Sequence, residues 1–295
     1  MKIFLILIFT SVLLYSCSNE STQPTGNNNT AAYTQIDFDP VLNSDKDTLV
    51  YINSNVNFKF TGMYSFDILN GFNKQLVNAI VRTPDISNID SKIVYSLNGQ
   101  LAVMDPDGMN SQIINGNVNS IYPKWSNDGN RILYENSDCL TGCGIRIINS
   151  DGTGDSLIIP KGRSPDWSIA ANEFIYLVSQ EGGNGDSLFN FNMNTGVRTL
   201  IKVLNPPEHK SSQYLNFVGG TVIFCSTSET GYSYVYKLTQ SIGIVEKLAL
   251  NQGWSPYYSE SNSMIYYTNR NEGNGRIWIM DFNGNGNRQY NEIYK

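Results

Sequence analysis

The sequence predicts an all-β fold, a six-bladed β-propeller with four antiparallel strands in each blade. Three observations support this: a twelve-residue motif occurs six times, its copies start about 43 residues apart, and the composition is that of a β protein. One four-stranded propeller blade takes roughly 40–45 residues, which matches the period. Tyr (18) and Gly (25) are frequent and charged residues make up only 16%, as in β-rich chains with many turns.

The motif becomes visible when its copies are aligned on a proline without gaps. The copies are PVLNSDKDTLVY (40–51), PDISNIDSKIVY (84–95), PKWSNDGNRILY (123–134), PDWSIAANEFIY (165–176), QYLNFVGGTVIF (213–224) and PYYSESNSMIYY (256–267). Position 1 is proline in five copies and Gln213 in the other, and position 4 is always small and polar. Position 3 is always large and apolar and position 12 always aromatic, so we expect both to pack blade against blade. These positions are Leu42, Ile86, Trp125, Trp167, Leu215 and Tyr258, and Tyr51, Tyr95, Tyr134, Tyr176, Phe224 and Tyr267.

The remainder of each unit supplies the other strands. A loop follows the motif, and then come a second apolar strand such as LAVMD (101–105), a glycine turn, and a short outer strand such as DSLII (155–159). One blade cannot bury both of its faces alone, so the units must stack around an axis. Proline is expected at the entry to the innermost strand, where a missing N–H matters little. The sequence leaves open how the ring closes; pairing of YTQIDF (33–38) with the last blade near NRQYN (287–291) is one route.

The first residues predict export. Lys2 precedes an apolar run, residues 3–15, whose helix would rise about 20 Å and so fall short of a bilayer core of about 30 Å. This pattern is typical of a secretory signal. LYSC (14–17) resembles a bacterial lipobox, in which Cys17 would be acylated; an ordinary signal with an incidental cysteine is the alternative.

The predicted organisation is therefore a signal peptide (1–16), a lipidated flexible tether (17–32) and a propeller (33–295). Ser18 stands where enteric bacteria place the Asp that retains lipoproteins at the inner membrane. That resemblance favours the outer membrane, with the protein either periplasmic or exposed at the cell surface.

A family resemblance rests on these motifs. Pro-x-Trp-Ser, an Asp-Gly turn, an apolar strand ending in an aromatic residue and I-x-I-M-D-x-x-G together resemble the TolB-type propeller repeat, a relative of the WD repeat. The resemblance covers residues 33–295 and implies six blades. TolB carries an additional α/β domain before its propeller, where this chain has a tether of about 15 residues. TolB's partnership with a peptidoglycan-associated lipoprotein is therefore not carried over.

The charge distribution excludes some partners. The formal net charge is −6, and lysines and arginines form no cluster. Binding to nucleic acid requires a basic footprint, and so does binding to an anionic membrane surface. We therefore expect no nucleic-acid partner, and contact with the membrane through the lipid anchor only.

The residues for catalysis are few. His209, in the loop NPPEHK, is the single histidine and is expected to be solvated. A Ser-His-Asp or Cys-His arrangement could use only this residue, and no Gly-x-Ser-x-Gly elbow is present. A zinc site typically needs two or three histidines. The family includes pectate-fragment lyases with a histidine-rich metal site, which this sequence cannot reproduce, and peptidases whose catalytic half it lacks. We predict no enzyme activity, no cofactor and no metal.

Two weaker possibilities concern acidic residues. The segments 149–155 and 281–287 space oxygen donors as calcium loops do, but hairpin turns are expected at both places. A carboxylate pair for glycoside cleavage could come from different loops, yet nothing selects a pair. The loop acids considered are Glu181, Asp186, Glu229 and Glu272, which are expected at solvated rims.

The remaining cysteines fit an oxidising compartment. Cys139 and Cys143 lie in one loop of the third blade with three residues between them, and we expect a disulfide there, with two free thiols as the alternative. Cys225 follows an apolar strand and is expected to be a buried free thiol.

Three functions remain, and we rank first a monomeric, membrane-anchored, non-catalytic binding or scaffold protein with an envelope protein as partner. Loops after position 12 should gather on one face, with Tyr232 as an aromatic contact. These loops are 52–63, 135–144, 177–187, 225–233 and 268–276. The alternative is a glycan-binding or carbohydrate-active lipoprotein that uses acidic and aromatic loop residues at one face. A structural envelope protein without a specific ligand comes third.

Overall fold

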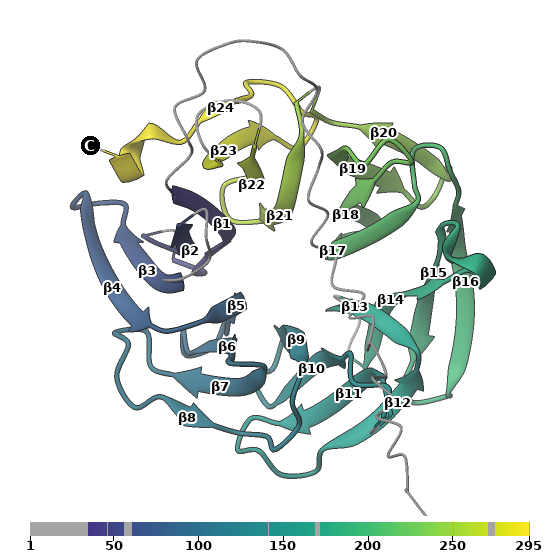
Figure 1. Cartoon of the computed structure of the whole chain (residues 1–295), viewed down its shortest axis with the longest axis horizontal. Helices are drawn as coiled ribbons and strands as arrows, with labels where there is room; N and C mark the ends of the chain where they lie inside the picture. Colours follow the sequence, from purple (N-terminus) through teal and green to yellow (C-terminus); the bar gives the residue numbers. More distant parts are fainter. Residues whose placement is uncertain are drawn as a thin grey trace, which may run out of the picture.

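The chain forms a ring of six blades around a central axis in the computed structural model (Figure 1). The structure describes residues 35–45, 47–55, 61–140, 142–168, 172–249, 251–270 and 275–294. The predicted six-bladed propeller is therefore confirmed. Cys17, the signal peptide and the tether lie outside the described residues.

Each blade consists of four consecutive antiparallel strands, with the first one innermost. Blades 1 to 3 comprise β1 (Gln35–Leu42), β2 (Thr48–Asn55), β3 (Thr61–Asp67) and β4 (Phe72–Asn78); β5 (Val81–Ile86), β6 (Ile93–Leu97), β7 (Gln100–Met104) and β8 (Gln112–Ile113); and β9 (Ser120–Trp125), β10 (Arg131–Asn136), β11 (Gly144–Asn149) and β12 (Ser156–Pro160). Blades 4 to 6 comprise β13 (Gly162–Trp167), β14 (Glu173–Ser179), β15 (Asp186–Asn192) and β16 (Val197–Leu204); β17 (Ser211–Val218), β18 (Thr221–Thr227), β19 (Ser233–Thr239) and β20 (Ile244–Lys247); and β21 (Gly253–Ser259), β22 (Met264–Asn269), β23 (Arg276–Asp281) and β24 (Arg288–Gln289).

Two short 3-10 segments complete the described secondary structure, η1 (Glu181–Gly183) and η2 (Asn291–Tyr294). Within the described part of the chain, no helix has the length and apolar character needed to cross a membrane.

The core is divided among the seams between neighbouring blades. At the seam of blades 2 and 3, for example, Val94 and Leu101 pack with Trp125, Ile132 and Tyr134. The second strand of each blade lies between two neighbouring blades and is buried on both faces, so it is apolar along its length. All six aromatic residues of motif position 12 lie on these strands and are buried.

The position-12 tyrosines combine a buried ring with a polar tip. Tyr134 donates its hydroxyl to Asp155 Oδ1 over 2.8 Å, and Tyr267 donates its own to Asn287 Oδ1 over 2.6 Å. Both acceptors belong to the turn before the outer strand of the same blade. A buried tyrosine normally requires such a partner, which explains why the motif ends in tyrosine more often than phenylalanine.

The expected position of proline at the start of the innermost strand is wrong. In β9, Pro123 lies within the strand, where the pairing with β10 skips Tyr122 and Pro123. A bulge of this kind breaks the ladder, so a residue without an N–H is tolerated there. The same bulge occurs in all six innermost strands.

The residue directly before the proline position of each innermost strand adopts the left-handed backbone conformation. Its φ lies between 45° and 56° in all six blades, although none of these residues is glycine. They are Asp39, Thr83, Tyr122, Ser164, Tyr214 and Ser255. Backbone conformations of this kind persist only where surrounding contacts compensate for them. Those contacts lie around the central channel.

The gap-free alignment of the fifth copy also requires correction. In the other blades the residue at position 3 pairs with the residue at position 10, as Trp125 does with Ile132. In blade 5 position 10 is Val222, and its partner is Phe217, which the alignment places at position 5. Phe217 therefore takes position 3 and Leu215 takes the position of proline, so the register assigned to Leu215 and Gln213 is wrong. The cause is a two-residue hairpin, Gly219–Gly220, which makes this copy two residues shorter. Leu215 nevertheless packs blade against blade, as predicted, because it is buried in one cluster with Ile175 of blade 4.

The ring does not close by pairing of residues 35–38 with the last blade near 287–291, because β1 pairs with β2 of its own blade and blade 6 supplies its own outer strand β24. Residues 33 and 34 lie outside the described part. Blade 6 meets blade 1 mainly through side chains: Arg276 bonds Asp37 at 3.1 Å, and the Tyr257 hydroxyl donates to the Leu42 carbonyl at 2.9 Å. One backbone bond, from Asp37 N to Gly275 O at 2.7 Å, joins them.

Ile293 of η2 provides a test of this closure. It is buried between Phe66 of blade 1 and Ile277 of blade 6 in a shared cluster. We expect Ile293→Ala to lower the free energy of unfolding by about 2 kcal/mol or more, because it leaves a cavity at the seam. Ile89→Ala is the matched control, since Ile89 is 67% exposed. Equal denaturation midpoints for the two variants would contradict a closing role for η2.

Candidate functional site

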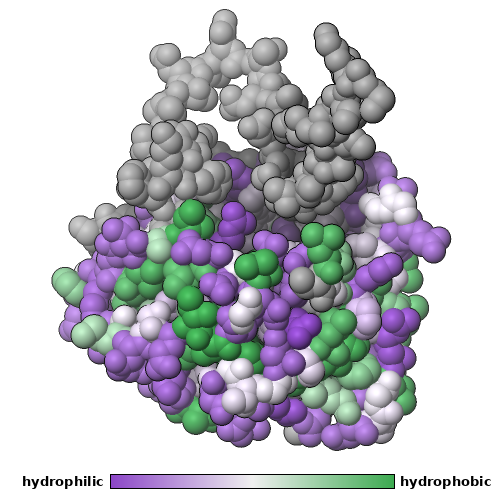
Figure 2. All heavy atoms as spheres, turned by 60° about the horizontal axis from the view of Figure 1, so that its bottom comes forward, coloured by the Kyte–Doolittle hydropathy of each residue, from purple (hydrophilic) through white to green (hydrophobic). Residues whose placement is uncertain are grey.

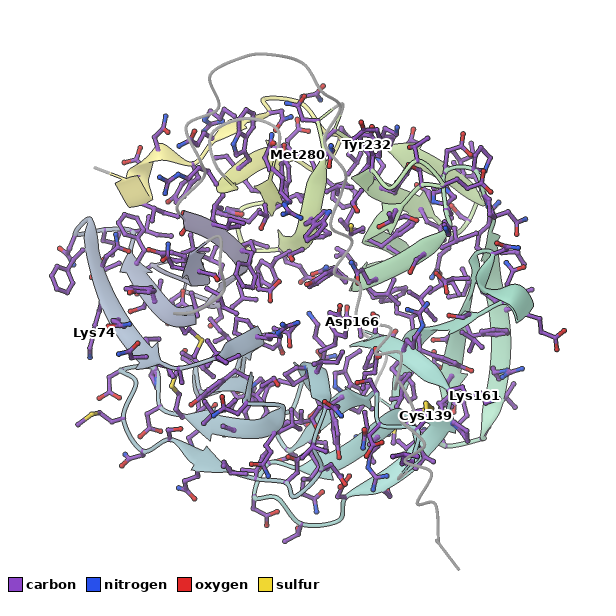
Figure 3. All side chains as sticks on the ribbon, in the orientation of Figure 1. Lys74, Cys139, Lys161, Asp166, Tyr232 and Met280 are labelled. Atoms are coloured by element: carbon purple, nitrogen blue, oxygen red, sulfur yellow. A yellow bond between two sulfur atoms is a disulfide. The ribbon has the colours of Figure 1, made fainter. Side chains whose placement is uncertain are left out.

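A channel runs along the axis of the ring and is lined by all six innermost strands. Its cavity volume is small, about 40 Å³. Its wall combines the bulge prolines with the polar residues before them, together with Lys124, Asn216 and Tyr257. Asp166, labelled in Figure 3, lies on this inner wall in β13.

The polar groups around the channel bond one blade to the next. The innermost strand of each blade is a sheet edge, so alternate N–H groups point away from the sheet and need another acceptor. Asp39 of blade 1 accepts the N–H of Thr83 in blade 2 at 2.9 Å. Thr83 Oγ1 then accepts the N–H of Tyr122 in blade 3 at 3.0 Å.

A second group of acceptors lies one residue after the proline position. Asp85 accepts the N–H of Trp125 at 2.8 Å, and Asp166 accepts the N–H of Phe217 at 2.6 Å. Asn216 donates its amide to the Pro256 carbonyl at 2.7 Å.

Together, these two groups of bonds cross the seams 1–2, 2–3, 4–5 and 5–6. The two remaining seams are crossed as well. Glu135 of blade 3 accepts the N–H of Ser164 in blade 4 at 2.9 Å. Ser255 of blade 6 donates its hydroxyl to Asp39 of blade 1 at 2.6 Å. Every seam therefore has at least one such bond, and these contacts hold the bulged residues in place.

Lys124 lies between two of these carboxylates. Its Nζ is 3.6 Å from Asp85 and 3.8 Å from Asp166. Burial raises the pKa of Asp166 to about 6, although the charge of Lys124 opposes this shift. Burial also raises the pKa of Asp85, against the same lysine. Burial disfavours the charged form of Lys124, but the two carboxylates together raise its pKa.

Both carboxylates also connect neighbouring blades. Asp85 and Asp166 each use one oxygen for a backbone bond to the next blade and pair with Lys124. Among the described residues, no three His, Cys, Asp or Glu side chains are placed to hold a metal ion together.

The prediction that His209 is solvated is wrong. It is half-buried, with its ring 4.6 Å from that of Tyr236 and 5.9 Å from that of Phe224. Its Nδ1 is buried without a partner among the described residues, and burial lowers the pKa of the imidazole. His209 packs against blade 5.

The four loop acids considered for a carboxylate pair differ in their surroundings. Asp186 was expected at a solvated rim, but it is buried at the start of β15, where it pairs with Arg163 and accepts the N–H of Ser212 at 2.5 Å. The hydrogen bond from Ser212 to Asp186 is another contact between blades 4 and 5. Glu181 and Glu229 are exposed, and Glu272 lies outside the described residues.

The two segments with calcium-like spacing are hairpin turns. Asp151 accepts the N–H and the hydroxyl of Thr153, and Asp281 accepts the N–H groups of Asn283 and Asn285. Hydrogen bonds within the turns lower the pKa of both carboxyls. Asp155 is directed instead at Tyr134 and Arg146.

Cys139 and Cys143 form a disulfide across one loop, with Cα atoms 4.2 Å apart. The Cys143 carbonyl accepts the N–H of Lys161 at 3.0 Å, so the loop is also tied to the β12–β13 connection (Figure 3). Leu140 lies within the closed loop and is 98% exposed. Cys225 is buried, and its Sγ contacts the Gly253 carbonyl at 3.4 Å.

The loops after position 12 lie on one face, because every blade has the same strand order around the axis. We call this the entry face, since the innermost strands begin there; its described loop residues include Leu140 and Tyr232. The opposite, exit face carries the exposed residues Leu69, Ile89 and Met109. The outer surface in Figure 2 is largely hydrophilic, with separate apolar patches.

Comparison with known proteins identifies the fold. No model of a known family matches the sequence, and no curated protein matches it. Solved structures with this fold include a putative TolB from Agrobacterium tumefaciens, with a TM-score of 0.65 and 15% identity over 77% of this chain and 87% of that one.

Two further structures place the chain among propellers of differing activity. TolB from Acinetobacter baumannii has a TM-score of 0.63 and 14% identity over 86% of this chain and 62% of that one. An oligogalacturonate lyase in complex with manganese has a TM-score of 0.56 and 10% identity over 88% of this chain and 92% of that one. At these identities the similarity shows the fold, a TolB-like six-bladed propeller.

The inter-blade acceptors were missed at the level of sequence. Four of them, Asp39, Thr83, Asp85 and Asp166, lie just before or just after proline, and Glu135 and Asp186 lie on β10 and β15. The motif positions 1, 3, 4 and 12 include none of these residues. A signal was present, because the residue before the proline position is polar or tyrosine in every blade once blade 5 is placed in the correct register.

The buried carboxylates predict a dependence of stability on pH. The pKa of Asp166 is about 6 in the folded protein against an ordinary value of 3.8, so between these values the folded state binds more protons. The free energy of unfolding must then fall as pH rises from 4 to 7. One pKa unit corresponds to about 1.4 kcal/mol, so Asp166 accounts for a fall of up to about 3 kcal/mol.

Asp166→Asn should flatten this fall in urea denaturation measured across pH 4–7. Asp128→Asn is the control, because hydrogen bonds in an exposed turn lower the pKa of Asp128 and place its effect below pH 4. Parallel pH profiles for the wild type and Asp166→Asn would show that Asp166 is not held in its protonated form.

Proposed function

We propose that this chain is a non-catalytic binding or scaffold protein of the bacterial envelope, anchored to the membrane through lipidated Cys17. The anchor is supported by the lipobox-like LYSC that ends the apolar N-terminal run. The outer membrane is its proposed location. The partner is another envelope protein, bound at the entry face.

The observation that carries this proposal is the loop closed by Cys139 and Cys143. Its Leu140 is almost fully exposed, although large apolar side chains in water are unfavourable. Val118, 53% exposed, is close along the chain to Asn119, whose carbonyl accepts the N–H of Ser137 at 3.1 Å. Because a disulfide limits the conformations of the loop, binding through it involves little additional ordering.

The absence of catalysis in this proposal is supported by where the ionisable groups lie. The buried acids Asp39, Asp85, Asp166 and Asp186 all accept hydrogen bonds from a neighbouring blade. A general acid or base must instead reach its substrate. Function then depends on the loops that the rigid ring presents.

The test is in-cell cross-linking and affinity capture with the native, anchored protein. We expect a recurrent, near-stoichiometric protein partner whose recovery falls about tenfold in Leu140→Asp, since a charge in an apolar contact is strongly disfavoured. Leu69→Asp on the exit face is the matched control, because Leu69 is 79% exposed. Cys17→Ala should also lose the partner, because the soluble form leaves the membrane.

Two results would count against the proposal. The absence of any recurrent protein partner for the anchored wild type would reject a scaffold role. Equal recovery with Leu140→Asp and Leu69→Asp would reject the entry face as the binding surface.

A further inference from the structure

A polar cleft opens between blades 4 and 5 on the exit face. Its volume is about 260 Å³. It is lined by Ser168, Glu173, Asn190, Thr199, Ile201, Phe217 and Gln240. These residues come from four strands, the turn after β13 and the turn after β19, so the cleft is built by both blades and is separate from the channel.

The cleft exists because of the short hairpin of blade 5. At other seams the loops after the innermost strands contact one another: a Cβ at Gly129 would lie 3.2 Å from Ile89 of the preceding blade, and Asn127 donates to the Ser168 carbonyl at 3.0 Å. Blade 5 has only Gly219–Gly220 at this place. A Cβ added at either glycine would meet no atom within 4 Å, so this hairpin presents no side chain and makes no close contact at these two positions.

The polar wall of the cleft is ordered but retains free hydrogen-bonding groups. Glu173 accepts the side-chain amides of Asn190 at 3.0 Å and Asn192 at 2.6 Å, which fixes the carboxylate. Asn190 Oδ1, the Thr199 hydroxyl and the Gln240 side-chain amide have no partner among the described residues. The cleft thus offers both donors and acceptors to a ligand.

The apolar part of the wall consists of Phe217 and Ile201. Both are half-buried and pack against the core cluster of blades 4 and 5. Ile201 is the extra residue of a bulge in β16, where the pairing steps from Lys202–Leu188 to Leu200–Phe189. The bulge and the packing of Phe217 hold these two side chains in place beside the polar groups.

We propose that this cleft binds one neutral monosaccharide ring of a glycan. A sugar ring presents hydroxyl groups around its edge and C–H groups on its faces, and this matches amide, hydroxyl and carboxylate groups beside an aromatic ring. Glu173 is the one ionisable group lining the described cleft, so an anion is repelled. A cation is not favoured either, because the only charged group it would meet in the described cleft is the Glu173 carboxylate, which already accepts two side-chain amides. The size suits a ligand smaller than the drug-sized molecules that fill pockets of about 300–1,000 Å³.

This inference does not depend on the entry face. The cleft opens on the exit face, so loss of sugar binding and loss of the protein partner are separate results.

The test is isothermal titration of the soluble Cys17→Ala protein with methyl glycosides of galactose, glucose and N-acetylglucosamine, and with galacturonate. We expect millimolar binding of at least one neutral glycoside, and weaker binding of galacturonate than of the galactoside. Thr199→Trp should weaken the binding at least tenfold by filling the cleft. Gln240→Ala should weaken it about three- to tenfold, as for one lost hydrogen bond.

Ser156→Trp is the control, because Ser156 is also an exposed hydroxyl residue on an outer strand, in blade 3. It should bind as the wild type does, and thermal denaturation should show that all variants are folded. The proposal is overturned if no neutral glycoside binds, if Thr199→Trp binds as well as Ser156→Trp, or if galacturonate binds more tightly than the galactoside.

Discussion

The hydrogen bond from an inner-strand N–H to a side chain of the preceding blade is the interaction on which the ring depends. An innermost strand has no neighbour on its channel side, so its outward N–H groups need acceptors there. Asp39, Asp85, Glu135 and Asp166 provide them from the preceding blade. This need explains why carboxylates are buried around a proline-lined channel.

Much of the fold could be predicted from sequence, because burial constrains residue type. The aromatic residue of position 12 packs at every seam, so six copies were enough to identify six blades. The bulges could not be predicted, because proline is compatible both with a strand entry and with a break in the ladder. Blade 5 was placed in the wrong register, since Leu215 and Phe217 both satisfy an apolar position.

The candidate sites were harder to predict, because they depend on pairs of residues from different blades. Asp186 reads as a loop acid, yet it is buried against Arg163. The cleft between blades 4 and 5 follows from a deletion of two residues in one blade, seen only beside the longer loops of its neighbours. The disulfide loop was within reach of the sequence, because its two cysteines are close along the chain.

Native-state hydrogen exchange of single amides tests the central account most directly. The N–H groups of Thr83, Trp125 and Phe217 all point to carboxylates across a seam. We predict that they exchange as slowly as the amides of the buried second strands, by opening of the whole ring. If they exchange as fast as the amides of exposed loops, the bonds across the seams do not hold the ring, and the account is contradicted.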